Sequence, residues 1–396
     1  MIWRCDLSRQ HAVYKDEIAS AVARVLESGL YTLGPEVRAF EEEFARYVGV
    51  PHCIGVANAT DGLTLALMAL GVGPGDEVIS TPFTAIPTVS AIVDAGATPV
   101  FVDIDPETYL LNAELVGAAV TSRTKAVMPV HIFGNVFDVR RLRAHLPREI
   151  PIVEDAAQAH GASIDGIMAG AMGDLGVFSF YPTKNLGAIG DGGAIVTDRA
   201  DLAEKLRRLR MFGMVDKDHI DSAGVNSRLH ELQAAILRVK LRHLEEMNRQ
   251  RTILAERYKQ ALAQNGFAFQ RIPSGVTCNY HVFVAETPGR RDELIEFLAQ
   301  RQIQTNIYYP FPLSRQKALA HFGYTEKDLP VAEALCRRVL ALPLYPELSE
   351  SEQQTVIDAI HEFFESVLIQ SISGKGEQPP KQKSVVSLEK PVISVK

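Results

Sequence analysis

The residues best suited to covalent chemistry surround Lys184, in the run SFYPTKNLGAIGDGGAIVT from Ser179 to Thr197. Lys184 is predicted to lie in a short polar loop between two apolar strands, and several glycines follow it closely. Most lysines are solvated surface charges, but a lysine held in such a loop loses its proton more easily. The neutral amine can then form an imine with an aldehyde cofactor. Neighbouring glycines let the backbone come close to a ligand.

A second candidate is Asp155, in the run IVEDAAQAHGA. It ends an apolar strand that we expect to be buried, where an unpaired carboxylate is costly, so a cationic partner is expected. A protonated pyridine nitrogen would serve, and it would make the ring an electron sink for amino transfer. The other interpretation is a helix N-cap aspartate at the strand end, and Asp155 taken alone favours that interpretation.

A third candidate is Thr60, in the run ANATDGL at the expected start of a helix over residues 61–70. Free backbone N–H groups at a helix start favour a phosphate, and the threonine hydroxyl can add a hydrogen bond. A plain threonine N-cap is the alternative, and the two roles are compatible.

The elements that must position these residues alternate regularly along the chain. Apolar runs predict strands at 78–81, 99–105, 126–132, 151–157, 176–180 and 192–197. Helices are expected between most of them, which is typical of a parallel sheet covered on both faces. Such sheets bind ligands at the carboxyl ends of their strands, where the three candidates fall.

The pattern changes after a long helical stretch at about 229–263. Strands predicted at 281–287 and 303–309 alternate with helices at 291–301 and 331–339, which indicates a smaller α+β domain. We therefore expect a large domain over 20–245, a smaller domain formed by 1–19 and 246–370, and a disordered tail at 373–396.

Composition excludes several classes of function. The formal net charge of −7 gives no basic field for nucleic acid or an anionic membrane. The four cysteines are far apart in sequence, and no zinc-type spacing of cysteine and histidine occurs, so no metal is expected. The N-terminus lacks the apolar core of a signal peptide, and no run is long enough for a membrane span. A cytoplasmic protein is expected.

Together, the runs resemble the DegT/DnrJ/EryC1/StrS family of sugar aminotransferases, which have the aspartate-aminotransferase fold (fold type I). The resemblance covers residues 8–365 or so. It is carried, in order, by GPEVRAFEEEFARYVGV, NATDGLTLALMALGVGPGDEVI, AGATPVFVDIDPETY, IVEDAAQAHGA, SFYPTKNLGAIGDGGAIVT, NSRLHELQAAILRVKL, YYPFPL and LPLYPELSE. It implies an α/β fold whose large domain has a mixed, mostly parallel sheet between helices, with a smaller α+β C-terminal domain.

The resemblance implies a role for individual residues. Lys184 matches the lysine that binds pyridoxal 5′-phosphate, Asp155 the acid at the pyridine nitrogen, and Gln158 the residue near the phenolic oxygen. The implied phosphate ligands are Ala59, Thr60 and Ser179. Asn226 matches an asparagine that reaches the phosphate in the partner subunit, which implies a homodimer with composite sites.

Three positions depart from the common family pattern. Many members have glycine where this chain has Ala59, a difference of one methyl. Many have an aromatic residue, stacked on the cofactor ring, where this chain has Ala85. Phe83 is then a candidate for the stacking face, with packing in the core as the equal alternative. Tyr308-Tyr309-Pro310 replaces the usual His-Tyr-Pro, which puts the predicted substrate contacts in doubt. Those contacts are Tyr308, Tyr309 and His160.

The implied reaction is a ping-pong transfer of the amino group of L-glutamate to a keto sugar carried by a nucleotide. The run around Lys184 looks most like the branch acting on C-3 keto sugars linked to dTDP or UDP, and C-4 amination is the alternative. Related sugar dehydratases have histidine at the lysine position, so Lys184 argues against dehydration. A nicotinamide-dependent oxidoreductase lacks support, because no G-x-G-x-x-G follows the first strand. A non-catalytic regulator with the same fold is a further, less favoured alternative.

Overall fold

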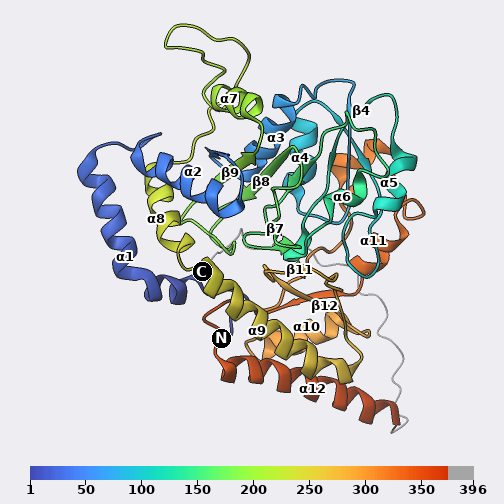
Figure 1. Cartoon of the computed structure of the whole chain (residues 1–396). Helices are drawn as coiled ribbons and strands as arrows, with labels where there is room; N and C mark the ends of the chain where they lie inside the picture. Colours follow the sequence, from blue (N-terminus) through green and yellow to red (C-terminus); the bar gives the residue numbers. More distant parts are fainter. Residues whose placement is uncertain (373–396) are drawn as a thin grey trace.

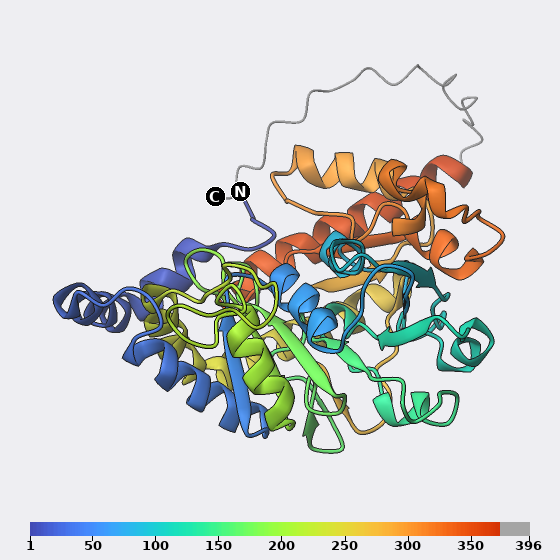
Figure 2. The same cartoon turned by 90° about the horizontal axis from the view of Figure 1, so that it is seen from above.

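The computed structural model describes residues 1–372, and the predicted disordered tail at 373–396 lies outside them. The chain forms an α/β body built on a large sheet, with a further layer of C-terminal elements beside it (Figures 1 and 2). The expected α/β class is confirmed. Within the described part of the chain, no helix combines the length and apolarity needed to cross a bilayer.

Seven strands make up the large sheet. They are β1 (His52–Val56), β2 (Glu77–Ser80), β3 (Thr98–Phe101), β4 (Thr124–Met128), β5 (Val153–Asp155), β8 (Leu175–Ser179) and β9 (Gly193–Thr197). Four pair in the order β1-β9-β8-β5 and three in the order β3-β2-β4. Parallel bridges Val127↔Ile152 and Val130↔Asp155 join the two groups between β4 and β5. Only β9 runs antiparallel to its neighbours, so the predicted mixed, mostly parallel sheet is confirmed.

Helices cover both faces of this sheet, as its fully buried strands require. One face packs against α3 (Ala59–Ala69), α4 (Ile86–Asp94) and α7 (Ala200–Leu209), with Val177 and Ile195 in the shared core. The other face packs against α2 (Pro35–Val48) and α8 (Glu231–Leu241), with Phe178 and Val196 between them. Shorter helices α5 (Ala113–Ala119) and α6 (Val139–Leu142) lie over the β4 end.

The C-terminal layer has its own core, which includes residues from 254 to 363. Its main helices are α9 (Leu244–Leu262), α10 (Arg291–Gln300), α11 (Pro330–Cys336) and α12 (Glu350–Ile372). Its sheet has the order β10 (Ala268–Phe269), β12 (Phe283–Glu286) and β13 (Val339–Leu342). A small sheet joins β11 (Val276–Thr277), β6 (Ser163–Ile164) and β7 (Ile167–Met168). Single turns of 3₁₀ helix lie at Ile132–Gly134, Ala263–Asn265 and Leu313–Arg315, and a longer one at Lys317–Phe322.

Several predicted elements differ from those observed. The stretch 229–263 is two helices, because the chain turns at Arg242 and His243 between α8 and α9. The strand predicted at 303–309 is irregular and makes only isolated bridges, while the helix predicted to reach 339 ends at Cys336. The segment 303–309 lies beside β13, where Asn306 pairs with Ala341.

Helix α1 (Leu7–Ser28) packs mainly on α8, and it extends along one side of the molecule (Figure 1). Ile2 and Cys5, which precede it, pack instead against the C-terminal core. The helix therefore runs through the domain boundary predicted at residues 19 and 20, and the division into two domains stays a prediction.

Candidate active site

Lys184 lies in the tight loop that joins β8 to β9, at the carboxyl end of β8. Its backbone N–H donates to the carbonyl of Tyr181 at 2.8 Å, which closes a turn. The loop folds back on itself so closely that a Cβ added at Gly187 would lie 2.3 Å from the carbonyl oxygen of Pro182. Only glycine fits there, so the glycines that follow the lysine shape its loop.

Burial lowers the pKa of Lys184 from its ordinary value to about 8, while the negative charge of Asp155 acts in the opposite direction. The side chain is half-buried, and no described residue accepts a hydrogen bond from its ammonium group. A lysine desolvated in this way spends part of its time as the neutral amine near neutral pH, which is the nucleophilic form.

Asp155 is the last residue of β5, and its side chain is almost fully buried. No helix begins after it, so the alternative of a helix N-cap is wrong. Its Oδ1 accepts from the backbone N–H of Ala157 at 3.1 Å, and its Oδ2 accepts from the Thr88 hydroxyl at 2.7 Å. Burial raises the pKa of Asp155, and these two hydrogen bonds act against that rise. Neither donor is charged, so the carboxylate still lacks a hydrogen-bonded cation.

Gln158 joins the turn after β5 to the predicted substrate region. Its Oε1 accepts from the backbone N–H of Phe133 at 2.8 Å, and its Nε2 donates to the Tyr309 hydroxyl at 3.1 Å. Phe83 is fully buried, and its ring meets those of Phe133 and Tyr309 edge to face. The structure therefore brings Gln158, Tyr309 and Phe83 together, and the stacking of Phe83 on the cofactor ring stays a prediction.

The predicted phosphate ligands lie where β8 ends and where β9 and α3 begin. Ser179 ends β8, Gly193 begins β9 and pairs with it, and a Cβ on Gly193 would lie 2.6 Å from the carbonyl carbon of Asn58. The N-cap of α3 is Asn58, whose side chain accepts from the N–H of Asp61 at 2.8 Å, so the N-cap predicted at Thr60 is wrong. Thr60 lies in the first turn of α3, and its hydroxyl is not used for capping. A helix start with this close backbone approach suits a phosphate.

These features fit pyridoxal phosphate. An anion would bind at the start of α3, an aldehyde would meet Lys184, and a protonated ring nitrogen would give Asp155 the cation it lacks.

Three predicted residues lie apart from this cluster or behind it. His160 is fully buried against Phe178 and Phe180, and burial lowers its pKa to about 3. It is therefore poorly placed to touch a substrate. Tyr308 is half-buried, with the guanidinium of Arg4 over its ring at 5.5 Å. Asn226 is exposed, beside Ser227, whose hydroxyl donates to Asp61 on α3 at 2.6 Å.

Two residues near the site were missed from the sequence. Thr88, on the buried face of α4, reaches Asp155 across the fold. Lys240 on α8 donates to the carbonyl of Gly187, inside the Lys184 loop, at 2.7 Å. The one sequence signal for Lys240 is a lysine on the apolar face of a helix, next to Val239 and Leu241.

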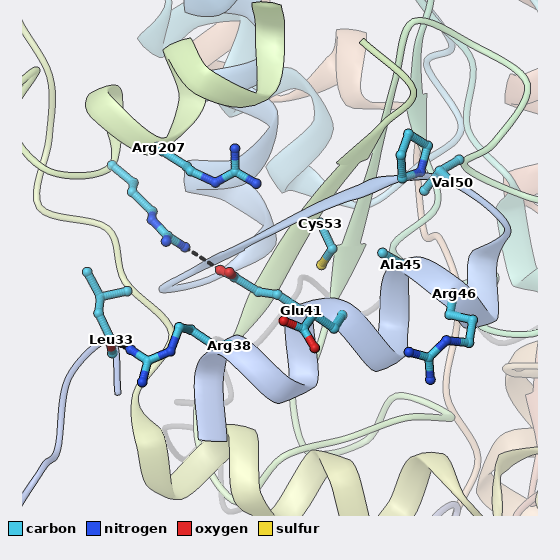
Figure 3. Close-up of a pocket in the computed structure, with 11 residues that line it drawn as sticks. Leu33, Arg38, Glu41, Ala45, Arg46, Val50, Cys53 and Arg207 are labelled. Carbon is cyan, nitrogen blue, oxygen red and sulfur yellow. Dashed lines mark hydrogen bonds and ion pairs between the residues drawn. The ribbon is translucent and has the colours of Figure 1, made fainter. Parts of the chain in front are cut away.

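A hollow of about 750 Å³ lies elsewhere, against α2 (Figure 3). Its charged lining includes Arg38, Arg46 and Arg207, together with an ion pair between Arg210 and Glu41 at 2.5 Å. None of the predicted site residues lines it, so this hollow is separate from the candidate active site.

Comparison with known proteins agrees with the geometry. A family model described as the DegT/DnrJ/EryC1/StrS aminotransferase family matches residues 13–361. A dTDP-3-amino-3,4,6-trideoxy-alpha-D-glucose transaminase of Micromonospora megalomicea subsp. nigra is 46% identical, over 87% of this chain and 94% of the relative. A pleiotropic regulatory protein of Geobacillus stearothermophilus is 44% identical, over 91% of this chain and 97% of the relative.

The crystal structure of DesV from S. venezuelae superposes with a TM-score of 0.88 at 44% identity, covering 91% of this chain and 97% of DesV. Pyridoxal phosphate is the cofactor of this chain. The match over almost the whole chain, on a site with the buried lysine and acid that such chemistry needs, shows that the chain belongs to the DegT/DnrJ/EryC1/StrS aminotransferase family.

Proposed function

We propose that this enzyme transfers the amino group of L-glutamate to a 3-keto sugar linked to dTDP or UDP, giving a 3-amino sugar. The observation that carries the proposal is the pairing of a desolvated Lys184 with a buried Asp155 at neighbouring strand ends. The printed name of the Micromonospora relative, a dTDP-3-amino sugar transaminase, supports C-3 over C-4 amination.

The chain's own residues divide the work. Bound pyridoxal phosphate supplies an aldehyde and an electron-withdrawing ring. The Lys184 amine would take the proton from the α-carbon of the donor and deliver it, within the same half-reaction, to the carbon that carried the aldehyde. In the second half-reaction it would move a proton the opposite way, to the sugar carbon that receives the amino group, so it acts as base and acid in each half. Asp155 keeps the ring nitrogen protonated, and the start of α3 holds the phosphate. The keto acid leaves before the sugar enters, so the kinetics are ping-pong.

We also propose that two copies of the chain form a homodimer with composite sites. The segment 211–230 projects beyond α7 (Figure 1), and it exposes Phe212, Val215, Ile220 and Val225. Leu30 and Tyr31, after α1, are exposed as well. Apolar side chains gathered on projecting segments are typical of a surface that a partner covers. Asn226 lies in the same segment and would reach the partner's phosphate. The cytoplasmic location stays a prediction.

The test is an assay of four nucleotide sugars in parallel, the 3-keto and 4-keto forms linked to dTDP and to UDP, with L-glutamate as donor. Turnover of a 3-keto sugar, with release of 2-oxoglutarate, is expected. Turnover of only the 4-keto sugars would contradict the proposed carbon. Absence of any amino transfer by cofactor-loaded protein would favour the non-catalytic regulator.

A further inference from the structure

Two buried threonine hydroxyls stand behind Asp155. The Thr88 hydroxyl lies 2.7 Å from Asp155 Oδ2, and the Thr84 hydroxyl lies 2.9 Å from that of Thr88. Thr88 is fully buried and Thr84 nearly so. Thr84 precedes α4 and Thr88 lies in its first turn, so the pair links the start of that helix to the end of β5.

The direction of these hydrogen bonds follows from the number of protons. A carboxylate only accepts, so the single hydroxyl proton of Thr88 points to Asp155. The Thr88 oxygen must then accept from Thr84, whose proton points to Thr88. The order is Thr84 to Thr88 to Asp155, and reversing it would leave the carboxylate oxygen without its donor.

The arrangement is not the ordinary use of a helical threonine. A threonine inside a helix can donate to a carbonyl one turn back, as the half-buried Thr252 on α9 does to Asn248 at 3.1 Å. Thr88 donates instead to a side chain 67 positions away in sequence.

The other groups facing Asp155 are few. Lys184 and His131 both favour the charged form of the carboxylate. Tyr309 faces it from the C-terminal layer, and burial raises the pKa of that phenol, so it stays neutral. Of these surroundings, only the Thr88 hydroxyl and the Ala157 N–H donate a hydrogen bond to the carboxylate. These two hydrogen bonds use one lone pair on each carboxylate oxygen, and the remaining lone pairs can accept from a ring nitrogen.

We propose that Thr88, oriented by Thr84, is a positioning residue that keeps Asp155 ionised and aimed at the pyridine nitrogen of the cofactor. This rests on the proposed function, because it gives Asp155 its role there. Without the Thr88 donor the carboxylate becomes more basic and free to rotate, so it holds the ring nitrogen less well.

The test compares the affinities of the protein for pyridoxal phosphate and for its 1-deaza analogue, which has carbon in place of the ring nitrogen. The ratio of the two dissociation constants isolates the contact with Asp155 from all phosphate contacts. Thr88→Val keeps the shape and removes the hydroxyl, and we expect it to reduce the preference for the natural cofactor about tenfold. Thr88→Ser should restore the preference to within about twofold, because it returns the donor.

Thr252→Val is the matched control, since it removes a hydroxyl of the same kind from α9, and it should leave the ratio unchanged. Thr84→Val should reduce the ratio about threefold, because Thr88 keeps its proton but loses its orientation. This variant carries the test if Thr88→Val does not fold. If Thr88→Val folds and keeps the wild-type ratio of dissociation constants, the proposal is overturned. If only Thr84→Val folds, a wild-type ratio in that variant overturns it.

The outcome is separate from that of the proposed function. If the wild-type protein aminates 3-keto sugars and Thr88→Val keeps the wild-type ratio of dissociation constants, only the positioning role is refuted. Suppose instead that the wild-type protein prefers the natural cofactor but turns over no sugar, and that Thr88→Val loses this preference. That result supports the positioning role and contradicts the proposed function.

Discussion

Two buried lysines in this protein show what separates a reactive amine from a structural one. Burial lowers the pKa of both Lys184 and Lys240 to about 8. The Lys240 ammonium donates to Gln10 Oε1 at 2.8 Å and to the carbonyl of Gly187 at 2.7 Å, whereas no described residue accepts from Lys184. The two acceptors favour the charged form of Lys240 and work against its shift. Both lysines are therefore desolvated, and what makes Lys184 available for chemistry is that its amine has no hydrogen-bond acceptor among the described residues.

The strongest test of this difference between the two lysines is to remove each amine in turn. Lys184→Ala should lower the rate of the first half-reaction at least ~10³-fold, because the base and the covalent attachment are both lost. Lys240→Met should keep the visible absorbance of bound cofactor and most of the turnover, while destabilising the fold by about 1–3 kcal/mol. Single-turnover kinetics with L-glutamate and urea unfolding measure the two effects. An equal loss of turnover in both variants would contradict the distinction.

Asp155→Asn tests the partner that only Lys184 has. The electron-withdrawing character of the ring depends on a charged acid, so the first half-reaction should slow about 10²-fold. In cofactor-free protein the pKa of Lys184 should fall further, because Asp155 acts to raise it. The pH dependence of labelling by an amine-specific reagent measures that pKa. Asp138→Asn, at the start of α6, is the control and should leave both quantities unchanged.

Gly193→Ala tests whether the phosphate cradle depends on close backbone approach. The added methyl would lie 2.6 Å from the Asn58 carbonyl carbon, so the start of α3 must shift. We expect the affinity for pyridoxal phosphate to fall about tenfold, as measured by equilibrium titration. Gly73→Ala meets no atom within 4 Å and should bind the cofactor as the wild type does. Wild-type affinity in Gly193→Ala would place the phosphate elsewhere.

The smallest expected effect is on how the free energy of unfolding depends on pH. Burial lowers the pKa of Lys184 to about 8 in the fold from an ordinary value of 10.5, so the unfolded chain binds more protons between those pH values. The free energy of unfolding of cofactor-free protein should therefore rise with pH across that window. The rise should be smaller in Lys184→Ala and also in Lys240→Met, because burial lowers the pKa of both lysines to about 8. Urea unfolding at several pH values from about 7.5 to 10 measures the slopes, and a wild-type slope in Lys184→Ala would contradict the lowered pKa.

Sequence patterns predicted the parts of this molecule that depend on local chemistry. Continuous apolar runs correctly indicated β5, β8 and β9, and the glycines after Lys184 correctly indicated a tight loop. The region 303–309 alternates like a strand, but it forms only isolated bridges, with Ile2 at Ile303 and with Ala341 of β13 at Asn306, and these partners are distant in sequence. Thr88 could not be recognised, because its hydrogen bond to Asp155 joins residues that only the folded sheet brings together.

The contact between Lys240 and Gly187 joins the loop of the reactive lysine to a segment that is made later. The carbonyl of Gly187 accepts from the ammonium group of Lys240, which also donates to Gln10 near the start of the chain. A nascent chain shorter than 240 residues therefore contains the whole loop but lacks the donor to this carbonyl. The bond can form only after α8 has been synthesised, and the second bond of Lys240 only after α1 has packed on α8.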